Sequence, residues 1–234
     1  PLVASAGIHL SSTENKMARV SLTLVSFGLC CLCTLFTVIG FSSPNWLESY
    51  TESQSTFVRL GLWEACFRNY RNDRDQLAKT YDGCWWIFSY EYRPIWQWLS
   101  PRWFLAVQII MTLVLILTLV TTLMTLLFMI DCCPDRRAAT TQLTNSLLMF
   151  GVGLLIAISV IIFGVQSDTD RQWLTRPDQN FLSWSFGLVV LAGFFAIFAG
   201  MCLLVDSLRI KAQARKENKE PMGGYIMKRA PPNY

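Results

Sequence analysis

The stretch that decides the fold is Trp46–Cys84, which reads WLESYTESQSTFVRLGLWEACFRNYRNDRDQLAKTYDGC. It begins with an isolated tryptophan, contains the triplet Gly61-Leu62-Trp63, and carries two cysteines, Cys66 and Cys84. Long uncharged apolar runs flank it on both sides. Such runs are typical of membrane spans, so the stretch predicts a small folded unit held at a membrane surface.

The composition also indicates a membrane protein. The chain has 234 residues, of which 53% are hydrophobic and only 15% are charged, whereas soluble domains have about 25% charged residues. The single histidine, His9, precedes the first apolar run, and no Gly-rich phosphate loop or basic face interleaved with aromatics is present. We therefore expect no enzyme activity, cofactor, metal site, nucleic-acid partner or small-molecule substrate.

Four apolar runs predict four membrane-spanning helices, because each exceeds the roughly 20 residues that cross a bilayer. The first run could instead be a cleaved signal peptide. Its apolar length exceeds the about 7–15 residues of a signal sequence, and no A-x-A-like site follows, so we interpret it as a span. The predicted spans are 20–41, 103–130, 143–165 and 182–205.

The distribution of Lys and Arg predicts the orientation of these spans. Basic residues crowd the segments 1–19, 131–142 and 206–234, which lie on one side of a four-span topology. We therefore expect both termini to be cytoplasmic, with a disordered tail over 206–234, and the loops 42–102 and 166–181 to be extracellular. Met17, just before the first run, resembles a natural start, and residues 1–16 are assigned no function.

The first outer loop is large enough for a small folded unit. Residues 56–63 and 84–92 are rich in aromatic and β-branched residues, which predicts strands, and the polar segment 68–79 predicts a hairpin tip or solvated loop. A unit this small needs a staple. Cys66 and Cys84 are the only cysteines expected outside, where a disulfide would contribute about 3 kcal/mol. Free thiols or an intermolecular bridge are the alternatives.

Three further patterns concern packing at and within the membrane. The second outer loop predicts a turn or one added strand leaning on the first loop. Small residues at helix-packing spacing predict close contacts within the bundle or a dimer face: Gly153, Ala157, Ala192, Ala196 and Gly200. Tryptophans near the outer ends of the spans predict anchors at the membrane interface: Trp96, Trp98, Trp103, Trp173 and Trp184.

The segments expected in the cytoplasm carry two candidate sites. Cys132 and Cys133 lie at the inner end of the second span, where cysteines are candidates for S-palmitoylation; ordinary reduced thiols are the alternative. The chain ends with Pro231, Pro232, Asn233 and Tyr234, a P-P-x-Y ligand for a WW domain. Capture of the terminal carboxylate by a PDZ groove is less favoured, because that groove prefers an aliphatic last residue.

The order Trp46, Gly61-Leu62-Trp63, Cys66 and Cys84 resembles the W…GLW…C…C signature of the claudin and peripheral-myelin-protein-22 superfamily, and Arg102 matches a position where claudins commonly keep an arginine. The resemblance implies a left-handed four-helix bundle carrying a small extracellular antiparallel sheet. It assigns the family disulfide to Cys66 and Cys84, and the seating of the sheet to the other signature residues.

The chain departs from typical claudins in two places. The 17 residues between Cys66 and Cys84 are more than is usual for claudins, and the terminal Tyr-Val of many claudins is missing. These departures resemble a divergent claudin-like protein of invertebrate septate junctions.

The resemblance implies a protein of cell–cell junctions that contributes to junction assembly and the paracellular barrier. Its expected partners are membrane lipids and junctional membrane proteins in the same or the opposing membrane, including further copies of itself. The alternative is an auxiliary or trafficking subunit of a channel or receptor. A transporter or intramembrane enzyme is disfavoured, because the four apolar runs contain no Asp, Glu, Lys, Arg or His.

Overall fold

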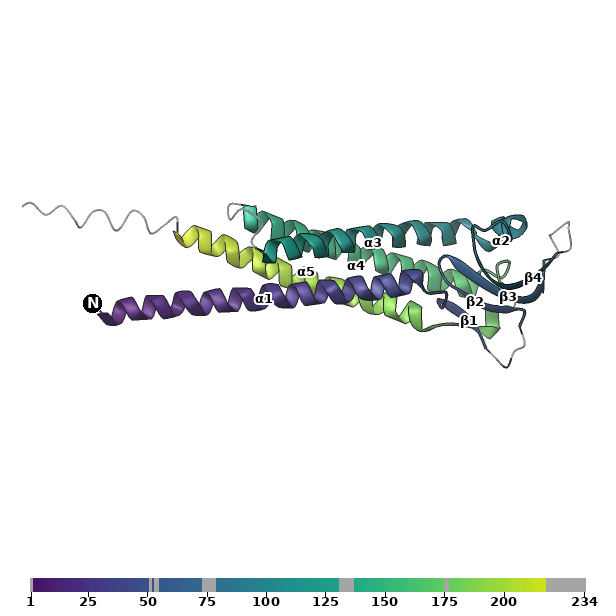
Figure 1. Ribbon diagram of the computed structural model, residues 1–234, viewed down its shortest axis with the longest axis horizontal. Coiled ribbons are helices and arrows are strands. Elements are labelled where there is room, and N and C mark those ends of the chain that lie inside the picture. The colour runs from purple at the N-terminus through teal and green to yellow at the C-terminus, as the bar shows by residue number, and fades with distance from the viewer. Residues whose placement is uncertain are drawn as a thin grey trace, which may run out of the picture.

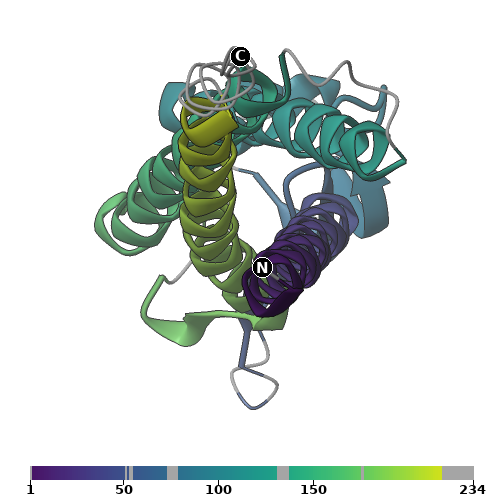
Figure 2. The same ribbon diagram turned by 90° about the vertical axis from the view of Figure 1, so that its left-hand side faces the viewer.

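Four long helices form a bundle, seen end-on in Figure 2, with a small sheet at one end (Figure 1). The computed structural model describes residues 2–50, 52, 55–72, 79–130, 137–174 and 177–217. The long helices are α1 (Leu2–Ser42), α3 (Arg102–Met129), α4 (Ala138–Thr169) and α5 (Trp184–Glu217). Each contains a segment long and apolar enough to cross a membrane, by length and composition. The prediction of a membrane all-α four-helix bundle with a small antiparallel sheet is confirmed.

The helices extend beyond the predicted spans into polar sequence. Helix α4 begins at Ala138 and continues to Thr169, and α5 runs past Val205 to Glu217. The prediction of a disordered tail was therefore wrong for residues 206–217, which are helical. Hydropathy marks only the apolar part of a helix, whereas the backbone hydrogen bonds continue through polar residues with good helix propensity. At the other end, Leu182 belongs to a strand rather than to the fourth span.

The sheet has five strands in the order β4-β3-β2-β1-β5, and all neighbours are antiparallel. Four strands come from the first loop and the fifth from the second loop, so the expected added strand is confirmed. The strands are β1 (Leu47–Ser49), β2 (Phe57–Leu60), β3 (Glu64–Arg71), β4 (Thr80–Trp86) and β5 (Asn180–Leu182).

Three predictions for the first loop were wrong in extent. Of residues 56–63, which were expected to form one strand, only Phe57–Leu60 belong to β2. Residues 84–92 do not form one strand, because β4 ends at Trp86 and the chain turns into the 3-10 helix η2 (Arg93–Ile95) and the short helix α2 (Trp96–Leu99). Pro94 lacks an N–H and suits a first helical turn rather than a ladder. Residues 68–71, expected in a loop, belong to β3, and residues 73–78 lie outside the described residues.

Helices α4 and α5 approach each other closely at small residues. A Cβ on Gly153 would lie 2.9 Å from Ile197 Cγ1, and one on Gly200 would lie 3.2 Å from the Phe150 ring. Ala192 and Ala196 are fully buried, whereas Ala157 is exposed. Most of the small residues therefore pack within the bundle.

The buried side chains of the bundle are aromatic near the sheet and more polar at the other end. Near the sheet it is aromatic, with Trp46, Phe104, Phe163 and Trp173 buried together. Trp173 was expected to anchor at the membrane interface, but it is only 4% exposed. Away from the sheet the interior carries buried polar groups on every long helix, among them Ser26, Thr121, Thr125, Gln142, Asn145, Ser146 and Asp206.

Candidate functional site: a disulfide-stapled sheet seated on the bundle

The staple joins the centres of the two longest strands. Cys66 of β3 and Cys84 of β4 lie directly opposite each other and form a disulfide with an S–S distance of 2.04 Å. The prediction of an intramolecular bridge is confirmed. Since the bridge crosses neighbouring strands, it holds the register of the β3–β4 hairpin at its middle.

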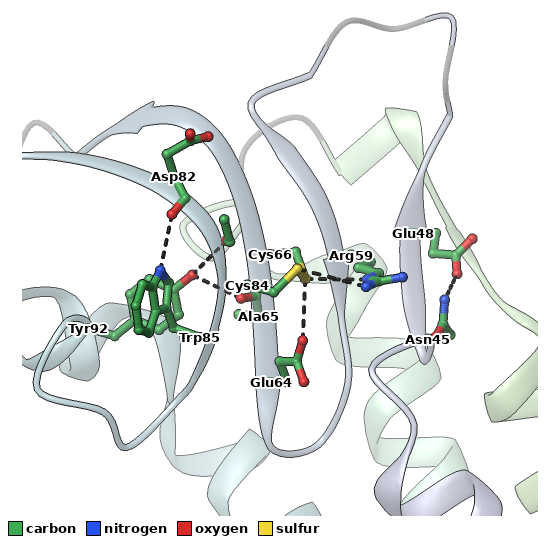
Figure 3. Close-up of a disulfide and its surroundings, with 11 residues drawn as sticks. Asn45, Glu48, Arg59, Glu64, Ala65, Cys66, Asp82, Cys84, Trp85 and Tyr92 are labelled. Carbon is green, nitrogen blue, oxygen red and sulfur yellow. Dashed lines mark hydrogen bonds between the residues drawn. A yellow bond between two sulfur atoms is a disulfide. The ribbon is translucent and has the colours of Figure 1, made fainter.

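A cation and a carboxylate flank the disulfide on the same face of the sheet (Figure 3). Arg59 of β2, the register partner of Cys66, donates from Nε to Cys66 Sγ at 3.3 Å. Glu64 Oε1 lies 3.8 Å from the same sulfur. Three potential metal-ligating residues therefore meet here, Glu64, Cys66 and Cys84. Sulfurs bonded to each other are not the thiolates that bind metals, so the cluster is a structural staple.

Trp46 connects the sheet to three helices. Its indole Nε1 donates to the carbonyl of Gly40 in α1 at 2.6 Å. Its ring packs edge-on against Phe163 of α4 and Phe186 of α5, with centroids 5.0 and 5.7 Å away. The backbone of Trp46 continues the sheet, because its N–H donates to Leu60 and its carbonyl accepts from Ser183. The side chain is fully buried.

The Gly61-Leu62-Trp63 triplet forms the turn between β2 and β3 and rests on the top of the bundle. A Cβ on Gly61 would lie 2.3 Å from the carbonyl oxygen of Ser43, so only glycine fits against the chain leaving α1. Leu62 is fully buried. The Trp63 ring packs on Phe41 of α1 at a centroid distance of 5.1 Å.

Two buried polar residues also hold the sheet on the bundle, and no sequence motif had pointed to them. Gln108 of α3 donates from Nε2 to the carbonyl of Leu62 at 2.5 Å, which ties the turn to the third long helix. The only signal for it was an amide inside an apolar run. The hydroxyl of Tyr92 donates to the carbonyl of Ala65 at 2.9 Å and holds the chain after β4 against β3.

The environment of Tyr92 favours its neutral form. Burial raises the pKa of Tyr92 above its usual value, and the nearby carboxylates of Glu91 and Glu64 raise it further. The side chain is fully buried.

The second loop is tied to the first by three tryptophan indoles. Trp98 donates to the carbonyl of Gln172 at 2.9 Å, Trp103 to Asp170 Oδ2 at 3.1 Å, and Trp173 to the carbonyl of Leu99 at 3.1 Å. The rings of Trp103 and Trp173 are 4.6 Å apart. These bonds fix the connection between α4 and β5 to the segment that enters α3, so both loops form one unit.

Aromatic side chains are exposed along and beyond strand β4, which is at one end of the strand order. We call this the β4 aromatic edge and define it by Trp85, Trp86, Phe88 and Tyr90. Their exposed fractions run from 48% for Trp85 and Phe88 to 84% for Tyr90. Trp85 and Trp86 are successive strand residues, so they expose aromatic surface on both faces of this edge. Exposed apolar surface of this kind often marks an interaction site.

The remaining predicted residues lie away from this site. Arg102 is the first residue of α3 and is exposed. The predicted palmitoylation site, Cys132 and Cys133, and the predicted WW ligand, Pro231, Pro232 and Tyr234, lie outside the described residues.

The fold and the staple define a class of protein: a multi-pass membrane protein in which four apolar helices carry a disulfide-stapled sheet. A family model described as "PMP-22/EMP/MP20/Claudin tight junction" matches residues 31–205, about three quarters of the chain. The chain therefore belongs to this family, whose members are structural membrane proteins. A search of curated protein sequences returned no significant match.

Proposed function

We propose that the protein acts at cell–cell junctions, where it contributes to junction assembly and the paracellular barrier. The observation that carries this proposal is the rigid presentation of the sheet. One disulfide, the Trp46 indole and the Gln108 amide hold the strands on the helices, and the β4 aromatic edge remains exposed. A rigid surface with exposed aromatics suits recognition of neighbouring proteins.

The proposed orientation places the sheet outside the cell and both termini in the cytoplasm. Figure 1 shows the start of α4 and the end of α5 at the end of the bundle away from the sheet. Basic residues lie just before the start of α4 and in the last turns of α5: Arg137, Arg209, Lys211, Arg215 and Lys216. The positive-inside rule assigns that end to the cytoplasm, and a disulfide in the sheet is consistent with an oxidising compartment. Protease protection of tags placed at each terminus and after Ser49 tests this orientation in intact cells.

The proposed partners are membrane lipids along the bundle and junctional membrane proteins at the sheet, including further copies of this chain. Large apolar side chains are exposed on all four long helices, for example Leu35, Ile116, Ile161 and Phe194. Lipid contact accounts for such side chains on membrane helices.

The alternative proposal is an auxiliary or trafficking subunit of a channel or receptor. The small residues at helix-packing spacing in the third and fourth spans would support it if they formed a face for a partner helix. In the structure Gly153, Ala192, Ala196 and Gly200 are used between α4 and α5. The junction proposal is therefore the better supported of the two.

Removal of the protein from an epithelium separates the two proposals. The junction proposal expects tagged protein concentrated at lateral contacts and an increased tracer leak when it is depleted. Rescue with wild type restores the barrier, whereas Cys66→Ser with Cys84→Ser does not, and Cys31→Ser serves as the cysteine control. Diffuse surface protein that follows a channel, with unchanged tracer flux, would contradict the proposal.

Two further proposals concern the segments expected in the cytoplasm: a covalent modification and a binding partner. Acylation of Cys132 and Cys133 would anchor the second connection to the membrane, and acyl-exchange labelling that is undiminished in the double Ser variant would refute it. A WW-domain partner would bind the last four residues. A tail peptide with Tyr234→Ala should therefore no longer bind the WW domain.

A further inference from the structure

Helix α5 continues past the end of α3 and the start of α4, on the side away from the sheet (Figure 1). Ile210 of α5 packs with Phe128 near the end of α3 and with Ala138 at the start of α4. Ser207 Oγ also donates to the carbonyl of Ala139 at 2.7 Å. The connection between two spans has to leave the hydrocarbon, so this level marks the membrane surface. The residues of α5 after Ile210 therefore lie at the height of the lipid headgroups.

The lipid-facing side of α5 can be followed down to this level. Large apolar side chains recur on it every three or four positions, which places them on one face of the helix. Their exposed fractions run from 41% for Met201 to 55% for Leu208. They include Phe194, Phe198, Met201, Val205 and Leu208. Ala212 comes four positions after Leu208 and continues the same face, but the residues around it are basic.

Ala212 is at the centre of this basic end of the helix. The nearest neighbours of a residue on a helix surface are those three and four positions away. For Ala212 these are Leu208, Arg209, Arg215 and Lys216. All five residues are exposed. We call them the Ala212 site, in which three cations and one apolar side chain surround a methyl group.

The chemistry of the Ala212 site suits a lipid with several phosphates. No acidic residue occurs from Ser207 to Lys216, so this turn of the helix is strongly positive. Arginine binds phosphate through two parallel hydrogen bonds, and lysine adds a point charge. Leu208 joins the site to the lipid-facing apolar side chains above it, which a water-soluble anion would not use.

We propose that the Ala212 site binds the headgroup of a phosphoinositide, an inositol lipid that carries phosphate monoesters. Each monoester has a charge of about −1.5 to −2 at neutral pH, which complements the three cations. The headgroup lies over Ala212, where the small side chain leaves room, and the glycerol end lies against Leu208. In the proposed orientation, on which this assignment of the leaflet rests, the lipid belongs to the cytoplasmic leaflet. The site lies outside residues 31–205, which the family model matches.

Native mass spectrometry of the detergent-purified full chain measures which lipid stays bound. We mix the protein with equal amounts of phosphatidylinositol 4,5-bisphosphate, phosphatidylserine and phosphatidylcholine. The wild type should retain the phosphoinositide about tenfold more than either other lipid. Equal retention of phosphatidylserine would show attraction to negative charge alone and would overturn the proposal.

Paired charge variants separate the site from the general positive charge of this end. Arg209→Gln with Arg215→Gln should lower phosphoinositide retention about tenfold. The control is Lys211→Gln with Arg137→Gln, which removes two charges from exposed residues at the same end of the bundle but outside the site. The control should keep most of the retention, and an equal loss in both variants would contradict the proposal.

Ala212→Leu tests the shape of the site without changing its charge. Leucine is a good helix former, so the unfolding midpoint should stay within about 2 °C of wild type, whereas the larger side chain should lower phosphoinositide retention several-fold. Ala214→Leu is the matched control, because Ala214 is also exposed and lies two positions away on the same helix. Unchanged retention in Ala212→Leu would show that the headgroup does not lie there.

Soluble inositol trisphosphate distinguishes a lipid site from a site for free phosphate. At a concentration equal to that of the lipid it should not displace the phosphoinositide, because it lacks the part that contacts Leu208. Displacement at equal concentration would overturn the lipid assignment. These measurements use purified protein and require neither the junction role nor its orientation in the cell, so their failure is distinct from a failure of the proposed function.

Discussion

Gly61 shows how one residue determines whether the sheet can sit on the bundle. Its missing side chain lets the β2–β3 turn touch the segment that leaves α1, where a Cβ would lie 2.3 Å from Ser43 O and 2.5 Å from Pro44 Cα. Both atoms are backbone, so they cannot move aside as a flexible side chain could. The glycine of the signature is required by this close approach.

Gly61→Ala should therefore destabilise the protein by about 1–3 kcal/mol, the usual cost of forcing an extra carbon into a packed site. Thermal unfolding in detergent measures this, with Gly187→Ala as a control because nothing lies within 4 Å of a Cβ there. Equal midpoints for the two variants would show that the turn does not need the contact.

Tyr92 makes stability depend on pH at the alkaline end. Its pKa is raised in the folded state by burial, so the folded protein holds the phenolic proton more strongly than the unfolded chain, whose tyrosine titrates near pH 10. The contribution is fully present below that pH and is lost as the pH rises above it.

We expect Tyr92→Phe to lose about 1 kcal/mol at neutral pH, because the hydrogen bond to Ala65 disappears. Its stability should also fall less steeply than that of wild type above about pH 10. Chemical unfolding at several alkaline pH values measures the difference. Parallel pH profiles for the two proteins would exclude this role for Tyr92.

At the level of elements, the packing of α4 on α5 depends on which face of α4 a small residue occupies. Gly153 faces α5, where a Cβ would meet Ile197 Cγ1 at 2.9 Å, whereas nothing lies within 4 Å of a Cβ on Gly151. The two glycines differ by two positions on one helix, so they form a matched pair.

Gly153→Val should lower stability by about 1–3 kcal/mol through overpacking, and Gly151→Val should have a much smaller effect. Thermal unfolding and size-exclusion chromatography of both variants provide the measurement. If Gly153→Val were stable but altered the oligomeric state, the small residues of α4 and α5 would form an intermolecular face instead.

The elements that could be predicted from the sequence are those with a local signal. Hydropathy located four spans, and the spacing of Trp46, the triplet and the two cysteines indicated the staple. The polar ends of α4 and α5 were missed because hydropathy marks only the apolar part of a helix, whereas the register of β5 (Asn180–Leu182) on β1 depends on contacts between distant segments. Such contacts leave no local periodicity in the chain.

At the scale of the whole molecule, the residues whose roles were not predicted share one property: their partners are distant in sequence. Gln108 bonds Leu62, Trp173 bonds Leu99, and Asp206 bonds Gln142 and Thr23. Asp206 was assigned to the cytoplasmic segment 206–234 because it follows an apolar run, but its helix continues and buries it. The buried aromatic cluster near the sheet and the buried polar groups at the other end of the bundle could therefore not be predicted from the sequence.

The proposed junction role predicts that the sheet recognises its counterpart on an adjacent cell. The most direct test expresses the tagged protein in cells that lack junctions, mixes them with non-expressing cells, and measures fluorescence at each kind of contact. The account predicts enrichment where two expressing cells meet, and its loss when Trp86 and Tyr90 of the β4 aromatic edge are changed to Ser. Uniform surface fluorescence of the wild type, at all contacts alike, would contradict it.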